Sequence, residues 1–199
     1  MALYLLRHGE TMWNREHRFQ GALDSPLTER GQAQARRYGL ALRQVLGETA
    51  PALVASPLGR AVSTMRLACA AAGWAADACR LDPDLRELSF GVFDGLTRAE
   101  IRDFAALEAG QASGDSFFFH CPGGESWDGL VQRIDLARHR LDPACDTVVF
   151  LHSMSGKVLR GRCLGLDRAA ILALDWPMEA IWRIAGGETC LTAALGAAA

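Results

Sequence analysis

The sequence predicts an α/β protein with a mostly parallel sheet covered by helices on both faces. Three short apolar runs, at residues 2–6, 52–55 and 147–151, are typical of buried strands. Each run is followed by a segment with helical periodicity, and repeated strand-then-helix units build parallel sheets. We therefore expect a three-layer α/β/α sandwich whose active site lies at the carboxyl ends of the strands.

The first unit begins with the apolar run at 2–6, which ends where the chain turns polar at Arg7-His8-Gly9. A helix should follow further along, because Thr28 is a good N-cap and Gly47 stands where a helix-ending glycine belongs. Apolar residues recur at helical spacing between these two ends: Tyr38, Leu42, Val45 and Leu46.

The second unit pairs the strand at 52–55 with a helix that we expect to begin at Ser56 and end near Gly73. Ser56 is a suitable N-cap, and Pro57 would then occupy the first helical position. The predicted apolar stripe again has a spacing of three to four residues: Val62, Met65, Cys69 and Ala72.

The segment from Asp82 to Gly124 is rich in glycine and lacks clear periodicity, and a long segment of this kind is usually functional or mobile. We expect residues 88–124 to form an irregular cap that partly covers the site. Helical periodicity resumes at Trp127, the strand at 147–151 ends in His152, and a helix reaches about Gly165. Further strands are predicted at 180–184 and 189–192, and one domain, 1–199, accounts for the whole pattern.

Composition excludes several classes of protein. Half of the 199 residues are hydrophobic and the formal charge is −2, which argues against disorder, nucleic-acid binding and a membrane-surface role. No signal peptide or membrane span is apparent, so a cytoplasmic location is expected. The six cysteines include no Cys-x-x-Cys pair, which gives no sign of a zinc knuckle or a disulfide framework. Lys157 is the single lysine against 20 arginines, an excess that we attribute mainly to genome composition.

Four cationic or cationisable side chains should meet at one edge of the sheet. The first strand leads to Arg7 and His8, the second leads within about one helical turn to Arg60, and the third ends at His152. Ligands of such sheets bind beyond the carboxyl ends of the strands. Two arginines can grip the oxygens of a phosphoryl group, so these residues predict a phosphate site that needs no metal and no cofactor.

The same residues suggest a reaction. A neutral histidine can attack phosphorus and form a phosphohistidine, which divides one difficult displacement into two easier ones. A second histidine, if protonated, adds a donor to the phosphate oxygens. A carboxylic acid must also protonate the leaving oxygen and later activate water, and Glu87 is the candidate because it begins the irregular segment.

Five motifs give the chain a family resemblance. They are LLRHGET at 5–11, SPLGRAVST at 56–64, LRELSFGVFDGLT at 85–97, PGGES at 122–126 and LHSMSGKVLRG at 151–161. Together with Asn14 and Gln20-Gly21, they resemble the histidine phosphatase superfamily, also called phosphoglycerate mutase-like and marked by an Arg-His-Gly motif. The motifs occur in the family order and span most of the chain.

The resemblance implies specific roles. His8 would be the phosphorylated nucleophile, Arg7, Arg60 and His152 would complete the phosphate pocket, and Glu87 would donate the proton. Asn14 and Gln20 match positions that contact phosphate or substrate. Ser153 departs from the family pattern, which has glycine after the second histidine, and its backbone N–H or hydroxyl could serve the phosphate.

Three functions remain open at this stage. The favoured one is a phosphomonoesterase acting on a small organic phosphate ester, because residues 88–122 contain six phenylalanines but only Arg98 and Arg102 as basic residues. A cofactor-dependent phosphoglycerate mutase is the alternative within the family, and a non-catalytic phosphate-binding protein is the alternative of another class. The expected partner is thus a small phosphate ester rather than nucleic acid, membrane or metal, and a homo-oligomer is possible. The remaining histidines, His17, His120 and His139, are interpreted as structural.

Overall fold

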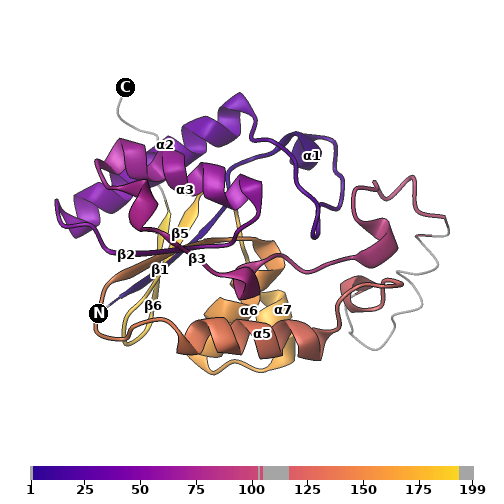
Figure 1. Ribbon diagram of the computed structural model, residues 1–199. Coiled ribbons are helices and arrows are strands. Elements are labelled where there is room, and N and C mark those ends of the chain that lie inside the picture. The colour runs from indigo at the N-terminus through magenta and orange to yellow at the C-terminus, as the bar shows by residue number, and fades with distance from the viewer. Residues whose placement is uncertain (1, 103, 105–116, 193–199) are drawn as a thin grey trace.

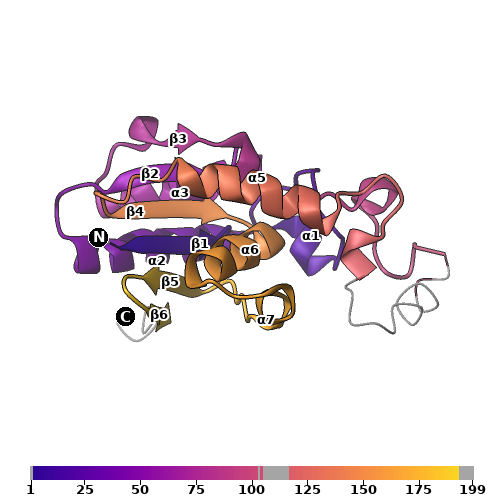
Figure 2. The ribbon, with the colours of Figure 1, turned by 90° about the horizontal axis from the view of Figure 1, so that it is seen from below.

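The computed structural model describes residues 2–102, 104 and 117–192, and a six-stranded sheet forms its centre. The strands lie in the order β3-β2-β4-β1-β5-β6, which Figure 2 shows from top to bottom. The four strands β1 to β4 are parallel to one another, whereas β5 pairs antiparallel with β1, and β6 pairs antiparallel with β5. Their bounds are β1 Leu3–Arg7, β2 Ala52–Ala55, β3 Arg80–Leu81, β4 Thr147–Leu151, β5 Ala180–Ile184 and β6 Glu188–Thr192.

Helices cover both faces of this sheet, as Figure 1 shows, so the predicted three-layer α/β/α sandwich is confirmed. One face carries α2 (Glu29–Leu46) and α3 (Gly59–Ala72), and the other carries α5 (Trp127–His139), α6 (Ser153–Leu164) and α7 (Arg168–Ala173). The short helix α1 (Met12–Arg15) lies beyond the carboxyl ends of the strands. Single 3-10 turns occur at Ala76–Ala78, Pro83–Leu85, Gly91–Phe93 and Phe117–Phe119.

Strand alternation divides the core into two apolar clusters. In β4, Val149 and Leu151 belong to the cluster beneath α5 and α6, whereas Val148 and Phe150 belong to the cluster beneath α2 and α3. Because all four side chains are fully buried, β4 is covered on both faces, as expected for a central parallel strand.

Most predicted element ends agree with the structure, with one clear correction. The hydroxyl of Thr28 caps α2 by accepting from the N–H of Gly31 at 3.0 Å, and Gly47 ends that helix with φ 74°. The second helix, however, begins at Gly59 rather than after Ser56. Asp24, from a distant loop, supplies the cap by accepting from the N–H of Arg60 at 3.2 Å.

Two further expectations are corrected or limited. Val45 does not belong to the buried face of α2, because it is 49% exposed. Val62 is only partly buried, although Met65, Cys69 and Ala72 of the same predicted stripe lie in the core. Of the predicted cap, residues 103 and 105–116 lie outside the described part. In the described residues, no helix is both long and apolar enough to cross a membrane.

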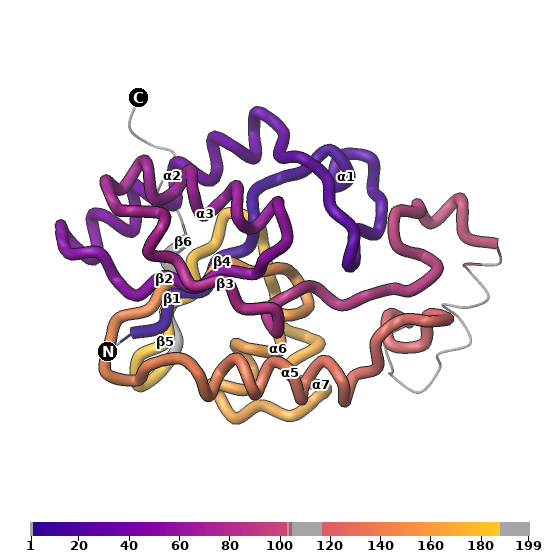
Figure 3. Tube along the Cα trace, viewed as in Figure 1, coloured from indigo at the N-terminus to yellow at the C-terminus, as the bar shows by residue number. Residues whose placement is uncertain are grey.

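The segment after β3 leads the chain to the site. Figure 3 shows it passing from β3 beyond the edge of the sheet and into the cap segment. The loop at 122–124 contacts this segment, since the N–H of Val92 donates to the carbonyl of Pro122 at 3.0 Å. A Cβ at Gly91 would lie 2.1 Å from that carbonyl oxygen, so this close approach requires glycine.

Candidate active site

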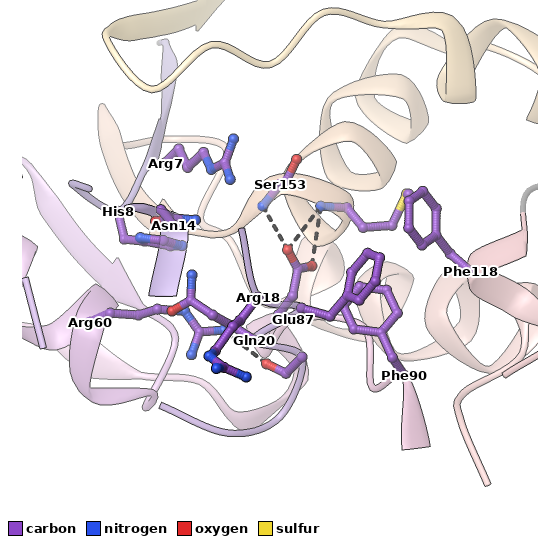
Figure 4. Close-up of a pocket in the computed structure, with 13 residues that line it drawn as sticks. Arg7, His8, Asn14, Arg18, Gln20, Arg60, Glu87, Phe90, Phe118 and Ser153 are labelled. Atoms are coloured by element: carbon purple, nitrogen blue, oxygen red, sulfur yellow. Dashed lines mark hydrogen bonds between the residues drawn. The ribbon is translucent and has the colours of Figure 1, made fainter. Parts of the chain in front are cut away.

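A pocket of about 220 Å³ lies at the carboxyl edge of the sheet and gathers most of the predicted site residues (Figure 4). The predicted residues that line it are Arg7, His8, Asn14, Gln20, Arg60, Glu87 and Ser153. They come from the end of β1, from α1 and the loop after it, from the start of α3, from the segment after β3 and from the start of α6. His152 lies just behind them, its ring centroid 5.2 Å from that of His8.

His8 has the geometry of a nucleophile. Its Nδ1 lies 2.8 Å from the carbonyl oxygen of Gly9, and a carbonyl only accepts, so Nδ1 carries the proton. The lone pair is then on Nε2. Burial, followed by the charges of Arg60 and Arg7, holds the pKa of His8 well below its ordinary value, and the imidazole is neutral. A neutral ring with a free Nε2 can attack phosphorus.

His152 is fully buried, and its pKa is also lowered well below the ordinary value, first by burial and then by Arg60 and His8. The ring is therefore neutral, unlike the protonated donor considered from the sequence. Its Nε2 lies 2.8 Å from Oγ of Ser56, and its Nδ1 has no hydrogen-bond partner within the described residues. A neutral His152 can still donate one hydrogen bond, through whichever nitrogen carries the proton.

Arg7 and Arg60 differ in the hydrogen bonds that hold their side chains. Arg60 is buried and donates to Asp24 and to the carbonyls of Gly21 and Leu23, so the loop at 21–24 fixes its guanidinium. Arg7, by contrast, makes one side-chain hydrogen bond within the described residues, a long one of 3.4 Å to the carbonyl of Trp176. Burial lowers the pKa of both arginines, yet each remains cationic because arginine starts from so high a value. Two cations thus flank His8, and Arg60 is the more firmly held of them.

Asn14 and Gln20 lie where a ligand of this pocket could reach them. The carbonyl oxygen of Asn14 caps α1 by accepting from the N–H of Thr11 at 3.0 Å, which leaves its amide N–H groups for the pocket. Gln20 is buried, and its Oε1 has no partner in the part of the chain that the structure describes. Both residues remain predicted contacts of the phosphate or the substrate.

The carboxylate of Glu87 packs against the first turn of α6. It accepts hydrogen bonds from the backbone N–H groups of Ser153 (2.9 Å), Met154 (3.1 Å) and Ser155 (3.1 Å), and Figure 4 shows the contacts with Ser153 and Met154. These are amides of a helix N-terminus, which have no partner within the helix itself. The departure at Ser153 does not disturb this contact, because its backbone donates to Glu87 while its hydroxyl is directed away (Figure 4).

Sequence reasoning missed part of the pocket. Arg18, Phe19, Phe90, Phe118 and Met154 also line it. The three phenylalanines pack together, with ring centroids of Phe19 and Phe90 5.3 Å apart and those of Phe90 and Phe118 5.5 Å apart. Within the run at 117–119, Phe117 is buried in the core, whereas Phe118 faces the pocket. Arg18 and Phe19 gave no local signal, since tertiary folding alone brings them to the site.

The fold and this pocket define a three-layer α/β protein with a histidine- and arginine-lined site at the carboxyl edge of its sheet. The family model of the histidine phosphatase superfamily (branch 1) matches residues 3–194. The chain belongs to this superfamily. Some of its relatives are named as phosphatases and others as mutases.

Similar proteins carry both kinds of name. "Probable phosphoglycerate mutase GpmB" of Erwinia tasmaniensis is 38% identical over 186 residues, covering 85% of this chain and 78% of its own. The protein of the same name from Enterobacter is 41% identical over 146 residues, which is 69% of this chain but 61% of the relative. The structure of the mycobacterial glucosyl-3-phosphoglycerate phosphatase Rv2419c with VO3 is similar at a TM-score of 0.74 and 28% identity, covering 92% and 90% of the two chains.

Proposed function

We propose that the protein is a metal-independent phosphomonoesterase that acts through a phosphohistidine on a small organic phosphate ester. The observation that carries this proposal is the state of His8, which is neutral, has Nε2 unprotonated and is flanked by Arg7 and Arg60. A nucleophile between two cations is suited to attack on a phosphate group, whose charge would otherwise repel it.

The reaction has two steps. Nε2 of His8 forms a bond to phosphorus as the P–O bond to the alcohol breaks, and Glu87 in its acid form protonates the leaving oxygen. Water then attacks the phosphohistidine, the P–N bond breaks, and Glu87 takes the proton that water gives up. Arg7, Arg60 and His152 donate hydrogen bonds to the phosphoryl oxygens, and Asn14 and Gln20 complete the contacts. The N–H of Ser153 holds Glu87 in this structure and would join these donors only by leaving that carboxylate.

The pocket favours a phosphatase over a phosphoglycerate mutase. A mutase must hold a small, highly anionic carboxylate and protect the phosphohistidine from water. Here the wall beside the phosphate site consists of Phe19, Phe90, Phe118 and Met154. The additional cation, Arg18, is already paired with Glu16 at 2.8 Å and with Glu100 at 2.7 Å. This wall suits an organic group with less charge than a carboxylate.

The mutase is the second candidate, favoured by the names of the two GpmB relatives. A non-catalytic phosphate-binding protein is the third candidate, and the departure from the family pattern at Ser153 is the sequence feature that favours it. A binding protein would not need a proton donor, so the presence of Glu87 in the pocket supports an enzyme. We also propose a cytoplasmic location, in keeping with the free thiols at Cys69, Cys79, Cys121, Cys145 and Cys163.

A panel of phosphate esters in EDTA tests the proposal. Phosphate release from organic esters is expected in wild-type protein, whereas His8→Asn should show neither turnover nor acid-labile phosphorylation. Rapid isomerisation of phosphoglycerate with no phosphate released from any ester would favour the mutase instead. Release of phosphate from an alkyl ester such as butyl phosphate that Glu87→Gln leaves unchanged would remove Glu87 from the mechanism, because an alkoxide needs a proton as it departs.

A further inference from the structure

Arg133, on α5, lies outside the pocket but holds the segment that carries Glu87. Its guanidinium has five N–H donors, and the structure uses five hydrogen bonds. NH1 donates to the carbonyls of Asp84 at 2.7 Å and Arg86 at 2.6 Å, and NH2 donates to the carbonyl of Glu87 at 3.2 Å. The other two bonds go to the two carboxylate oxygens of Glu125, at 2.6 and 2.7 Å.

This contact matters because no regular secondary structure holds the backbone of the segment. Residues 86–90 belong to no helix or strand, so no ladder of backbone hydrogen bonds fixes Glu87. Its side chain rests on the first turn of α6, and its own carbonyl rests on Arg133 of α5. Glu87 is thus positioned from two helices, one through its carboxylate and the other through its backbone.

Glu125 reaches Arg133 because a glycine-rich loop docks on the same segment. The N–H of Glu125 donates to the carbonyl of Ser89 at 3.0 Å. A Cβ at Gly124 would lie 2.9 Å from that carbonyl oxygen, so the approach requires glycine. The PGGES motif therefore delivers a carboxylate that both neutralises Arg133 and fixes the plane of its fork, as a bidentate pair does.

We infer that Arg133 and Glu125, here called the Arg133–Glu125 clamp, are positioning residues that act through Glu87 to set the proton transfer of the reaction. The inference rests on the proposed function, since it assigns Glu87 as the proton donor. Misplacing a reacting group by about 1 Å can cost a factor on the order of 10² in rate, so a clamp on its backbone has a kinetic consequence.

The leaving group provides a readout that a merely structural role would not move. An alkoxide needs a proton as it departs, whereas 4-nitrophenolate departs readily without one. Arg133→Lys keeps the charge but loses the fork. We expect Arg133→Lys to lower kcat/KM on the order of tenfold for butyl phosphate. For 4-nitrophenyl phosphate, kcat/KM should fall by less than about threefold. In a Glu87→Gln background the same substitution should change neither value by more than about twofold.

Arg162→Gln is the matched control, because it removes a comparable fork, between Arg162 and Asp135, that touches neither Glu87 nor its segment. Equal losses for both esters, or a loss that adds to that of Glu87→Gln, would overturn the inference. If Arg133→Lys does not fold, as judged by thermal unfolding, Glu125→Gln decides on the same criteria. Should Glu87→Gln itself not discriminate between the esters, Glu87 is not the proton donor of the proposed function, and the inference about the clamp falls with that role.

Discussion

Ser56 shows how one hydroxyl can set the chemistry of a neighbouring histidine. Its Oγ accepts from the N–H of Leu58 at 3.3 Å, which leaves the hydroxyl hydrogen for Nε2 of His152 at 2.8 Å. If Nε2 accepts, the proton of the neutral ring is on Nδ1, the nitrogen without a partner in the described structure. His152 would then enter the site as a donor to phosphate without needing a positive charge.

The substitution Ser56→Ala tests this assignment. Without the hydroxyl, nothing selects the Nδ1–H form, and a buried nitrogen loses its partner, which costs about 1–3 kcal/mol. We expect kcat/KM to fall roughly tenfold. Imidazole ¹⁵N spectra should show His152 protonated on Nδ1 in wild type and as a mixture of tautomers in the variant. Ser63→Ala, at an exposed position on α3, is the control and should leave both readouts as they are. An unchanged tautomer in Ser56→Ala would contradict the assignment.

At the scale of elements, α2 and α3 pack so closely that the contact depends on glycine. A Cβ on Gly39 of α2 would lie 2.0 Å from the carbonyl oxygen of Ala68 on α3, well inside any real contact. We expect Gly39→Ala to lower the free energy of unfolding by about 1–3 kcal/mol, because the strain exceeds the gain in helix propensity of about 1 kcal/mol.

Urea denaturation measures this change. Gly187→Ala is the control, since an added Cβ there meets nothing within 4 Å. A Gly39→Ala variant as stable as wild type would show that the two helices can separate at little cost. Measured activity is not needed for this test, because Gly39 does not line the pocket.

Predictability also differs between elements, for physical reasons. The strands at 3–7, 52–55 and 147–151 could be predicted because a continuous run of apolar residues is typical of a strand buried on both faces of its sheet. The two residues of β3 are both exposed, and the strand exists only through its pairing with β2, which no local pattern encodes. The start of α3 was misplaced for the same reason, because its cap comes from Asp24.

The candidate site divides in the same way. Arg7, His8 and His152 could be placed because each lies at the end of a strand whose position was already predicted. Arg18 and Phe118 could not be placed in this way. An isolated bridge to Thr97 brings Arg18 to the pocket. The packing of four phenylalanines around Phe19 brings Phe118 there. Such contacts depend on the folded chain as a whole.

At the scale of the whole molecule, the buried histidines link stability to pH. His8 and His152 are neutral in the folded protein because their pKa values lie well below 6.5, whereas unfolded histidine titrates near 6.5. Below that pH the unfolded chain binds protons that the folded protein does not. Stability therefore rises with pH through this range, and it is lost as the pH falls below about 6.5.

The magnitude can be tested by urea denaturation between pH 7 and pH 5 in a phosphate-free buffer. Each fully buried imidazole contributes roughly 1 kcal/mol per pH unit once the unfolded chain is protonated. Wild type should thus lose about 2 kcal/mol between pH 6 and pH 5, and the double variant His8→Asn/His152→Asn should lose much less. The exposed pair His17→Asn/His139→Asn serves as control and should keep the wild-type slope. Equal slopes in wild type and the buried-pair variant would mean that the folded protein accepts these protons. His8 would then be cationic below pH 6.5 and could not attack phosphorus there.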